Sequence, residues 1–514
     1  GSTTIGAGTL QIGSAGALGW SSGTSTGSYA GTISNAGTLQ YSSSVDQTLS
    51  GVISGSGALL KDTSGSSTLT LTARNTYSGT TTVNAGTLTI NPPDDSYNTY
   101  GVASTQFNVG AGATLMFTGG SNRLNLGYTG ATTMALGNGG TVDFKGAGMV
   151  GMNTLTFSSS GATATIKSSA GTGVNLNNQS FVFDTATGST LTNSISFGNS
   201  TGTFTKKGAG TAVTSANLNY SGATTISGGT LQLSGSSLLN LGSYGGSITF
   251  SNSSTLQYSS SGAQTLSGKI TGAGALLKDT STSVLTLSGS NDYTGTTTVK
   301  AGTVKYDSAS GVSADSAVTV DAGATLSVNY QAATRNTTTT VNGTLSLAGG
   351  SLTFAANSGS HTIATLDSSG TTTSTMSINN GATVTLNAKT GTGTTTITVN
   401  TGGTLVLSGG INTSTLNITL AGGTLKITDG ITVSLGTLSQ TAASTIDMGS
   451  STTSFVSLTA ATLTPSTYTM TVSNWTSGSD HFYATAITGN PSKNTLNVAP
   501  LNVITLGSNL ASQT

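Results

Sequence analysis

A stretch of the sequence that occurs twice constrains the fold more than any other feature. Residues Gly55–Ile90 read GSGALLKDTSGSSTLTLTARNTYSGTTTVNAGTLTI, and Gly272–Tyr306 read GAGALLKDTSTSVLTLSGSNDYTGTTTVKAGTVKY. Threonine alternates with leucine or valine in both copies, and a period of two is typical of β-strands with one buried face. Glycine and asparagine separate these segments and tolerate the positive φ angles of turns. Strands this short cannot bury a core alone, so we expect stacked coils, an all-β parallel β-solenoid.

Partial copies of the repeat predict how the rest of the chain is organised. Thr3–Gly13 is similar to Thr224–Ser234, so the chain begins inside a repeat, and Lys206–Leu233 is a third, degenerate copy. The first residues have neither the basic region nor the apolar stretch of a signal peptide. We expect one elongated body in five successive segments, namely 1–90, 91–205, 206–306, 307–450 and 451–514.

Two of these segments have distinctive features. Pro92 and Pro93, followed by Asp94 and Asp95, break the strand pattern and predict a protruding loop near 91–100. The last segment, 451–514, contains three prolines and an aromatic cluster, which suits a C-terminal cap or an assembly segment.

Composition limits the partners of such a body. The chain has 15 basic and 15 acidic residues, only 6% charged residues in total, and no cysteine. A neutral surface has no electrostatic footprint for nucleic acid, while a net charge of zero favours association with copies of the same chain. No apolar run reaches the roughly 18 residues of a membrane span. The absence of cysteine excludes disulfides and thiolate metal sites.

Both full copies resemble the passenger-associated β-strand repeat of bacterial autotransporters. The first copy carries the family pattern at Gly55, Gly57, Leu59, Lys61, Thr68–Leu71, Asn75, Tyr77, Gly79, Thr81–Val83 and Gly86–Leu88. The second carries it at Gly272, Gly274, Leu276, Lys278, Leu285–Leu287, Asn291, Tyr293, Gly295, Thr297–Val299 and Gly302–Val304. The resemblance implies a right-handed β-solenoid, exported by a diderm bacterium to its outer cell surface or the extracellular space. It implies no particular activity.

Candidate catalytic and metal-binding residues are few, and each has a simpler explanation. His361 and His481 have no neighbouring ligand pattern, so we expect surface histidines on a strand or turn. Two matches to Gly-x-Ser-x-Gly, Gly23–Gly27 and Gly198–Gly202, do not lie on the strand-to-helix turn of a nucleophile elbow.

The carboxylates and the recurring lysine are also expected to have no catalytic role. Asp94, Asp95 and Asp143 are scattered, whereas a glycosidase needs two carboxylates at a fixed separation. Lys61-Asp62 and Lys278-Asp279 recur at one place in the repeat and predict a solvated turn. The sequence therefore predicts no catalytic residue, no metal site and no cofactor, and the chain is not expected to be an enzyme.

We expect the Asn-x-Tyr turn and the threonine runs to be structural. Asn75 and Asn291 can bond their own turn, and Tyr77 and Tyr293 can cover the coil with a wet hydroxyl group. Regular threonine ranks on a solenoid face occur in ice-binding proteins, but the runs here are irregularly spaced, which favours ordinary strand propensity. These runs are Thr80–Thr82, Thr296–Thr298, Thr337–Thr340, Thr371–Thr373 and Thr394–Thr396.

The preferred functional hypothesis is a non-catalytic structural protein of the cell surface or extracellular matrix. Copies of the chain would associate into a fibre or layer, because the surface is neutral and the strand edges are unpaired at the ends. The alternative is an autotransporter-type adhesin that binds surfaces, glycans or exopolysaccharide through loops such as Asn91–Tyr100. A polysaccharide-cleaving enzyme and an ice-binding protein are further hypotheses that the sequence leaves open.

Overall fold

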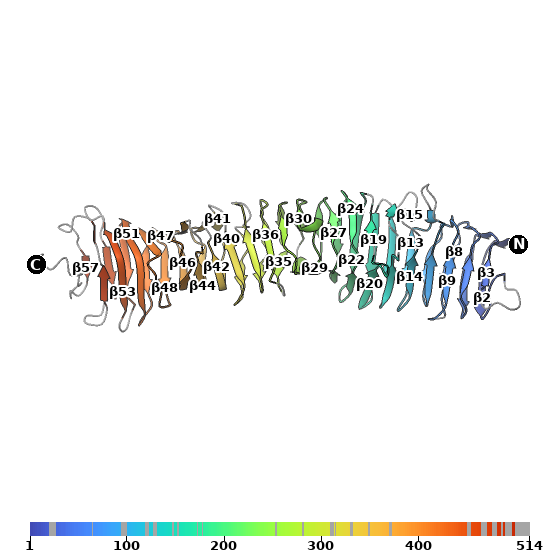
Figure 1. The fold of residues 1–514 in the computed structure, drawn as a ribbon, viewed down its shortest axis with the longest axis horizontal. Coiled ribbons are helices and arrows are strands. Elements are labelled where there is room, and N and C mark those ends of the chain that lie inside the picture. Colours follow the sequence, from blue (N-terminus) through green and yellow to red (C-terminus); the bar gives the residue numbers. More distant parts are fainter. Residues whose placement is uncertain are drawn as a thin grey trace, which may run out of the picture. The chain divides into compact units, whose positions relative to one another are not determined.

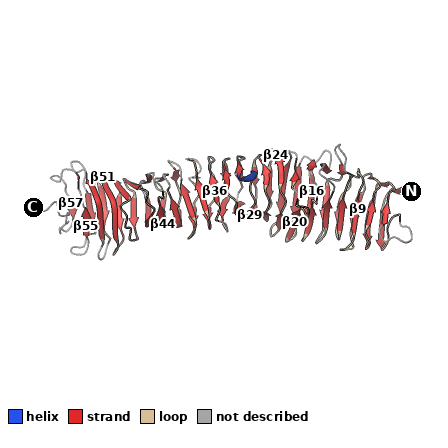
Figure 2. Cartoon of the chain, in the orientation of Figure 1, coloured by secondary structure: helices blue, strands red, loops and turns tan. Residues whose placement is uncertain are grey.

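The computed structural model describes residues 1–19, 27–63, 65–93, 100–118, 123–126, 131–145, 149–151, 154–171, 173–176, 178–251, 254–279, 282–308, 313, 315–328, 333–347, 350–369, 373–449, 454–463, 470–474, 481–484, 487–488 and 496–498. Over these residues the strands pair in parallel with strands of the following coil, which confirms the predicted parallel β-solenoid. Figure 1 shows the strands as successive rungs. A short 3-10 helix, η1 (Asn240–Gly242), is drawn in blue in Figure 2.

The chain divides into two compact units. Unit 1 comprises residues 1–264 and 272–274, and unit 2 comprises residues 265–271 and 275–514. Strands β33 (Gln264–Leu266) and β34 (Ile270–Gly272) lie in the sequence where the units divide. The finer division into five segments stays a prediction.

Unit 1 contains four sets of parallel strands, which we call sheets A, B, C and D. Sheet A contains β1 (Thr3–Ile5), β4 (Ile33–Asn35) and β7 (Ile53–Ser54). Sheet B contains β2 (Thr9–Ser14), β5 (Thr38–Ser43), β8 (Ala58–Lys61), β10 (Thr81–Val83), β13 (Gln106–Val109), β16 (Thr132–Leu136), β19 (Thr154–Ser159), β22 (Ser180–Thr185), β25 (Phe204–Lys207), β28 (Thr224–Ile226) and β31 (Ile248–Phe250).

The other two sheets of unit 1 are sheets C and D. Sheet C contains β3 (Gly27–Tyr29), β6 (Gln47–Leu49), β9 (Thr68–Leu71), β11 (Thr87–Ile90), β14 (Thr114–Phe117), β17 (Gly140–Asp143), β20 (Thr163–Lys167), β23 (Thr190–Asn193), β26 (Thr211–Thr214), β29 (Gly229–Gly235), β30 (Ser243–Tyr244) and β32 (Ser254–Ser260). Sheet D contains β12 (Tyr100–Val102), β15 (Arg123–Leu126), β18 (Met149–Gly151), β21 (Val174–Asn175), β24 (Phe197–Ser200) and β27 (Leu218–Tyr220).

Unit 2 contains a further run of sheet C strands and a separate sheet E. Its sheet C strands are β35 (Ala275–Lys278), β36 (Val284–Leu287), β37 (Thr297–Val299), β38 (Thr303–Tyr306), β39 (Val318–Val320), β40 (Thr325–Val328), β42 (Thr339–Ser346), β44 (Gly359–Asp367), β46 (Ala382–Thr390), β48 (Thr404–Leu407), β50 (Thr424–Ile427), β52 (Ser444–Asp447), β54 (Met470–Ser473) and β57 (Leu496–Val498). Sheet E contains β41 (Ala333–Arg335), β43 (Ser351–Phe354), β45 (Ser374–Ile378), β47 (Thr395–Asn400), β49 (Leu416–Ala421), β51 (Thr432–Ala442), β53 (Phe455–Leu463) and β55 (His481–Ala484), and β56 (Ile487–Thr488) also pairs with β53.

The core of unit 1 follows directly from the period-two pattern. In β9 and β11 the leucines and the isoleucine are buried, while the intervening threonines are partly exposed. Leu69 is aligned with Leu88, and Leu88 with Leu115, so identical side chains stack from coil to coil. Aromatic rings continue this core, and the Phe181 and Phe204 ring centroids lie 4.5 Å apart. Such pairs add roughly 0.5–1.5 kcal/mol each beyond the area they bury.

The core of unit 2 includes an apolar ladder that crosses a change in coil geometry. The ladder consists of buried aliphatic side chains in direct register, namely Val299, Val320, Val341, Ile363, Leu386, Leu407 and Ile427. Strand β42 pairs with β39 through one half and with β40 through the other. Two short strands of one coil therefore become one long strand in the next, and the core continues without a break.

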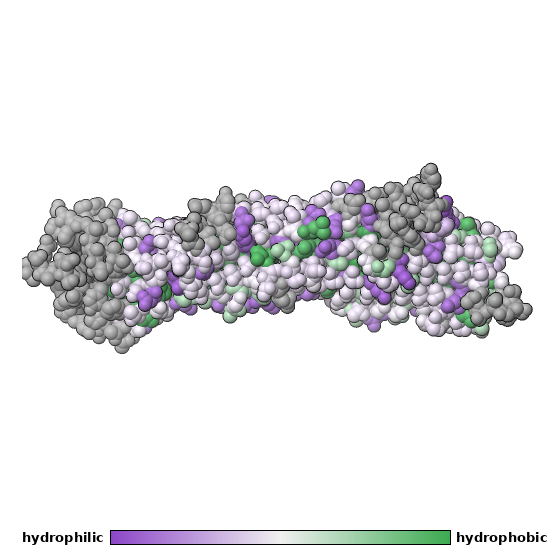
Figure 3. Space-filling view, in the orientation of Figure 1, coloured by the Kyte–Doolittle hydropathy of each residue, from purple (hydrophilic) through white to green (hydrophobic). Residues whose placement is uncertain are grey.

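The surface carries little charge. In the view of Figure 3 most described atoms are pale, with scattered purple and a few green positions. Among the described residues, Val52 and Leu241 are the large apolar side chains classed as exposed. No helix within the described part of the chain is long and apolar enough to cross a membrane.

Candidate functional site

The lysine of the repeat is a core residue and not part of a solvated turn, so that prediction was wrong. Lys61, Lys206 and Lys278 are all 0% exposed. The Lys61 ammonium donates to the carbonyl oxygen of Ala85 at 3.1 Å, and Lys278 donates to that of Ala301 at 3.3 Å. Alternation within β8 explains the burial, because Lys61 lies on the same face as the buried Leu59.

Each lysine bonds the turn of the following coil at an equivalent position. Lys206 donates to the carbonyl oxygens of Lys207, Gly208 and Gly228 at 2.6, 2.9 and 3.1 Å. The glycines that follow Ala85, Gly228 and Ala301 have φ angles of 70°, 58° and 71°. In this left-handed region the turn carbonyl points inward, and the ammonium group satisfies it.

Burial dominates the electrostatics of these lysines. It lowers the pKa of Lys61 and Lys278, against the opposing effect of Asp62 and Asp279. For Lys206 burial lowers the pKa to about 8, with Asp184 acting in the opposite direction. Asp62 itself is half-buried and accepts hydrogen bonds from Ser42 and Gln40, so in the first copy the lysine lies in the interior and the aspartate at the edge of the surface.

The repeat tyrosines are also fully buried, which corrects the expectation of wet hydroxyl groups. Tyr77 and Tyr293 are 0% exposed, and their hydroxyls bond Thr81 and Thr297 at 2.8 and 2.6 Å. The degenerate copy has the same pair, Tyr220 with Thr224. Burial raises the pKa of all three tyrosines. The inward threonine of Thr-Thr-Val therefore serves as the partner of the tyrosine.

The repeat asparagines bond backbone, as predicted, and they also reach the preceding coil. Asn75 donates to the carbonyl oxygen of Ala73 at 2.9 Å, within its own turn. Its side-chain oxygen accepts from the backbone N–H of Ile53 at 2.9 Å, and Asn291 accepts from that of Ile270 at 2.8 Å. The asparagine therefore connects two successive coils.

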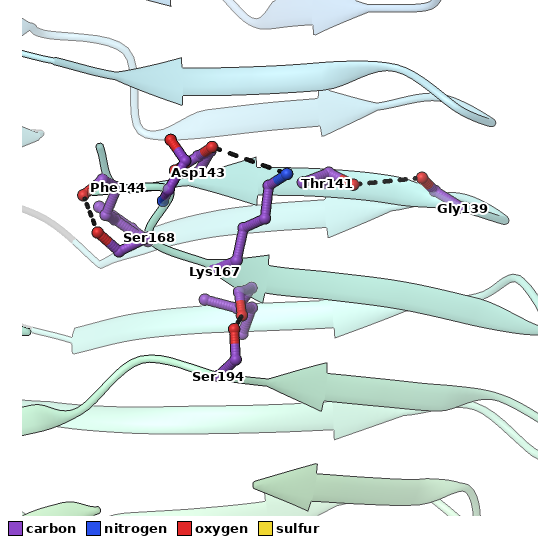
Figure 4. A network of polar contacts seen from close by, with 9 residues as sticks. Gly139, Thr141, Asp143, Phe144, Lys167, Ser168 and Ser194 are labelled. Atoms are coloured by element: carbon purple, nitrogen blue, oxygen red, sulfur yellow. Dashed lines mark hydrogen bonds and ion pairs between the residues drawn. The ribbon is translucent and has the colours of Figure 1, made fainter. Parts of the chain in front are cut away.

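Asp143 belongs to a structural network of unit 1. It is 1% exposed, and its carboxylate accepts from the backbone N–H of Ser169 at 2.9 Å. The ammonium group of Lys167 lies 3.9 Å from the same carboxylate, as the dashed line in Figure 4 shows. Ser168 donates to the carbonyl oxygen of Phe144 beside it. The carboxylate therefore ties neighbouring coils together and has no second carboxylate partner in this network.

His361 lies in the core of unit 2 and not at the surface, so that prediction was also wrong. It is 1% exposed, its Nδ1 accepts from the backbone N–H of Thr339 at 3.2 Å, and its Nε2 lies 2.9 Å from the hydroxyl oxygen of Ser358. Because Nδ1 is an acceptor, the neutral ring carries its proton on Nε2, which donates to Ser358. Burial, together with the charge of Arg335, lowers the pKa of His361 to about 4. His481 lies on strand β55, and its side chain is outside the described residues.

Arg335 is a buried residue that the sequence interpretation missed. It is 1% exposed and donates to the carbonyl oxygen of Ser313 at 2.7 Å, to that of Ser316, and to the hydroxyl of Thr339 at 3.1 Å. The alternation of inward and outward side chains along strand β41 is the sequence signal that could have indicated the burial of Arg335. Like the lysines, it binds backbone carbonyls of a neighbouring coil.

The remaining candidates do not form a catalytic arrangement within the described chain. Ser200 of the second Gly-x-Ser-x-Gly match ends strand β24, and the chain continues into strand β25 and not into a helix. The first match and the Asp94-Asp95 pair fall largely or wholly on residues outside the described part, as does most of the loop near 91–100. No group of three or more histidine, aspartate or glutamate side chains that could hold a metal ion occurs among the described residues.

The threonines are far more regular in space than in the sequence. In unit 2 one outward rank of sheet C consists of five threonines in direct register, namely Thr298, Thr319, Thr340, Thr362 and Thr385. Turns of unequal length explain the difference, because they change the spacing along the chain without changing the register. The irregular spacing used in the sequence interpretation was therefore a poor guide to the arrangement of hydroxyl groups.

Comparison with known protein families agrees with the repeat geometry. A family model described as the passenger-associated transport repeat matches residues 64–90, 204–233 and 279–305, which overlap the two full copies and the degenerate copy. No curated protein and no solved structure matches the chain. The repeat family implies secretion to the cell surface or extracellular space of Gram-negative bacteria. The chain is thus a β-solenoid that carries three passenger-associated transport repeats, consistent with an autotransporter passenger repeat protein.

Proposed function

We propose that this chain is a non-catalytic structural component of the bacterial surface or extracellular matrix. The observation that carries the proposal is the burial of the repeat lysines, each of which donates to a backbone carbonyl of the next coil. A buried cation that is bonded to its own backbone stabilises the scaffold and is not presented to a substrate. These three lysines therefore serve the fold.

Self-association is the second part of the proposal. Equal numbers of acidic and basic residues, with only 6% charged residues, give little repulsion between copies. Outward strand positions carry threonine and serine hydroxyls, which can bond a second copy without burying an unpaired charge. Assembly of this kind should depend little on salt, because screening acts on charges and few are present.

A concentration series on the intact chain tests this function. We expect sedimentation velocity to show growing assemblies at low and high ionic strength, with fibres or layers visible by electron microscopy. A species that stays monomeric at every concentration would contradict the self-association. Cleavage of a polysaccharide that Asp94→Asn or Asp95→Asn abolishes would contradict the non-catalytic role.

A further inference from the structure

Sheet E of unit 2 presents two adjacent ranks of small polar side chains on its outer surface. The first rank, in direct register from coil to coil, is Thr334, Thr353, Ser377, Thr398, Thr419 and Ser439. The second rank is Ser351, Thr375, Thr396 and Asn417, followed by Thr437, whose N–H bonds the Asn417 side chain. We call these two ranks the hydroxyl face.

The burial pattern shows that both ranks point away from the core. In β47 the residues between and beside them, Ile397 and Val399, are 0% exposed, while Thr396 and Thr398 are partly exposed. Strand β43 shows the same alternation around Thr353. Neighbouring strands lie about 4.8 Å apart, and residues i and i+2 lie about 6.7 Å apart along a strand. The hydroxyl groups therefore form a two-dimensional lattice.

The chemistry of this lattice differs from that of the last coils of sheet C in the same unit. The two ranks of the hydroxyl face contain no charged and no aromatic residue. On sheet C of the same unit, by contrast, the rank Thr404, Thr424 and Thr445 runs beside Lys426 and Asp447, which form an ion pair at 3.6 Å. Charged groups interrupt that surface, whereas the hydroxyl face is uniform.

We propose that the hydroxyl face binds the surface of ice. An ice surface is uncharged, repeats in two dimensions and offers hydrogen-bond donors and acceptors, and each of these properties has a counterpart in the two ranks. Threonine adds a methyl group beside each hydroxyl, so the face can order water without holding it as tightly as an ion would.

The composition of the face argues against sugars and ionic partners as occupants. Sugar rings pack best on aromatic side chains, which have a large apolar body, and neither rank contains one. An ionic partner would need charges of opposite sign, which are also missing from both ranks. This inference does not rest on the proposed self-association, because ice binding can be measured on dilute, monomeric chain.

The experiment measures thermal hysteresis and adsorption to ice for the full chain and two matched variants. Thr398→Tyr places a bulky side chain in the centre of the hydroxyl face, and Thr424→Tyr makes the same change on sheet C. Tyrosine is a good strand former, so both variants should keep the circular dichroism and melting temperature of the parent chain. Thr419→Val, which keeps the shape and removes a hydroxyl, serves as a second variant of the face.

We expect hysteresis and ice adsorption for the parent chain and for Thr424→Tyr. Thr398→Tyr should lose most of both, and Thr419→Val should lose part. Absence of hysteresis in the parent chain, or equal loss in both tyrosine variants, would overturn the proposal. Binding to insoluble cellulose or chitin, or lateral association of copies, that Thr398→Tyr removes without any effect on ice would also overturn it.

Discussion

The ammonium nitrogen of Lys61 lies 3.1 Å from the carbonyl oxygen of Ala85, and the two residues belong to successive coils. The same relationship joins Lys278 to Ala301 in unit 2. The lysine of the passenger-associated repeat thus satisfies a carbonyl that the left-handed glycine turn directs inward. Its charge is tolerated because backbone oxygens replace part of the water that burial removes.

Replacing a buried lysine should therefore destabilise the solenoid much more than replacing an exposed one. We expect Lys206→Met to lower the free energy of unfolding by about 1–3 kcal/mol, because three carbonyl oxygens lose their donor. Lys207→Met is the matched control, since Lys207 is exposed, and it should change stability by less than about 0.5 kcal/mol. Thermal or denaturant unfolding measures both. Equal effects would argue against the role of Lys206.

The tyrosine–threonine pair should show a measurable coupling energy. Tyr77→Phe removes the hydroxyl that bonds Thr81 at 2.8 Å and should cost about 1 kcal/mol. In Tyr77→Phe the Thr81 hydroxyl remains buried without this partner, so adding Thr81→Val should cost less than it does in the parent chain. A double-mutant cycle measured by denaturant unfolding isolates the coupling energy between the two hydroxyls. Strictly additive effects would show that the hydroxyls do not interact.

The buried histidine predicts a loss of stability at acidic pH. The pKa of His361 is about 4 in the folded chain, against its ordinary value of 6.5. As the pH falls from 6.5 to 4, His361 binds a proton in the unfolded chain but stays neutral in the folded chain. The free energy of unfolding therefore decreases by roughly 3 kcal/mol across this window. Protonation at Nδ1 would also oppose the N–H of Thr339.

The variant His361→Gln tests this pH dependence directly. Glutamine does not titrate, so the slope of unfolding free energy against pH between 6.5 and 4 should become smaller than in the parent chain. At pH 8 the substitution changes the free energy of unfolding only through packing, by an amount that does not depend on pH. An unchanged slope would show that other groups cause the acid sensitivity.

Close packing of successive turns predicts that Gly79 cannot be enlarged. A Cβ atom at Gly79 would lie 2.3 Å from the carbonyl oxygen of Gly57 in the preceding coil. Gly79→Ala must therefore shift the backbone, and we expect a loss of about 1–3 kcal/mol from overpacking. Gly6→Ala is the control, because no atom lies within 4 Å of a Cβ there. Melting temperatures that fall equally in both variants would contradict this account.

The repeat predicted the fold because its period-two alternation and glycine turns are local signals. Leu59, Leu69 and Leu88 lie in the core as that alternation requires. The same rule places Lys61 inside, and the sequence interpretation failed there because it followed the charge of lysine and not its position in the strand. The period-two alternation predicts burial better than the charge of a side chain does where the next coil supplies hydrogen-bond acceptors for the buried group.

Other features depend on register between coils, which the sequence does not display. The ranks that contain Thr353 and Thr398 are aligned only after turns of unequal length have been folded. His361 and Arg335 were difficult to place for the same reason, because their partners Thr339 and Ser313 come from other parts of the sequence. Pairs of outward Ser or Thr residues around one apolar residue are the signal that could have revealed the hydroxyl face.

The central claim is that repeat lysines hold successive coils together from the interior, and lysine labelling tests it most directly. The native chain is treated with an amine-reactive reagent, and the modification of each lysine is quantified by mass spectrometry. The account predicts protection of Lys61, Lys206 and Lys278, with ready labelling of the exposed Lys207 and Lys300. Labelling of all five at similar rates in the folded chain would place the repeat lysines in solvent and contradict the account.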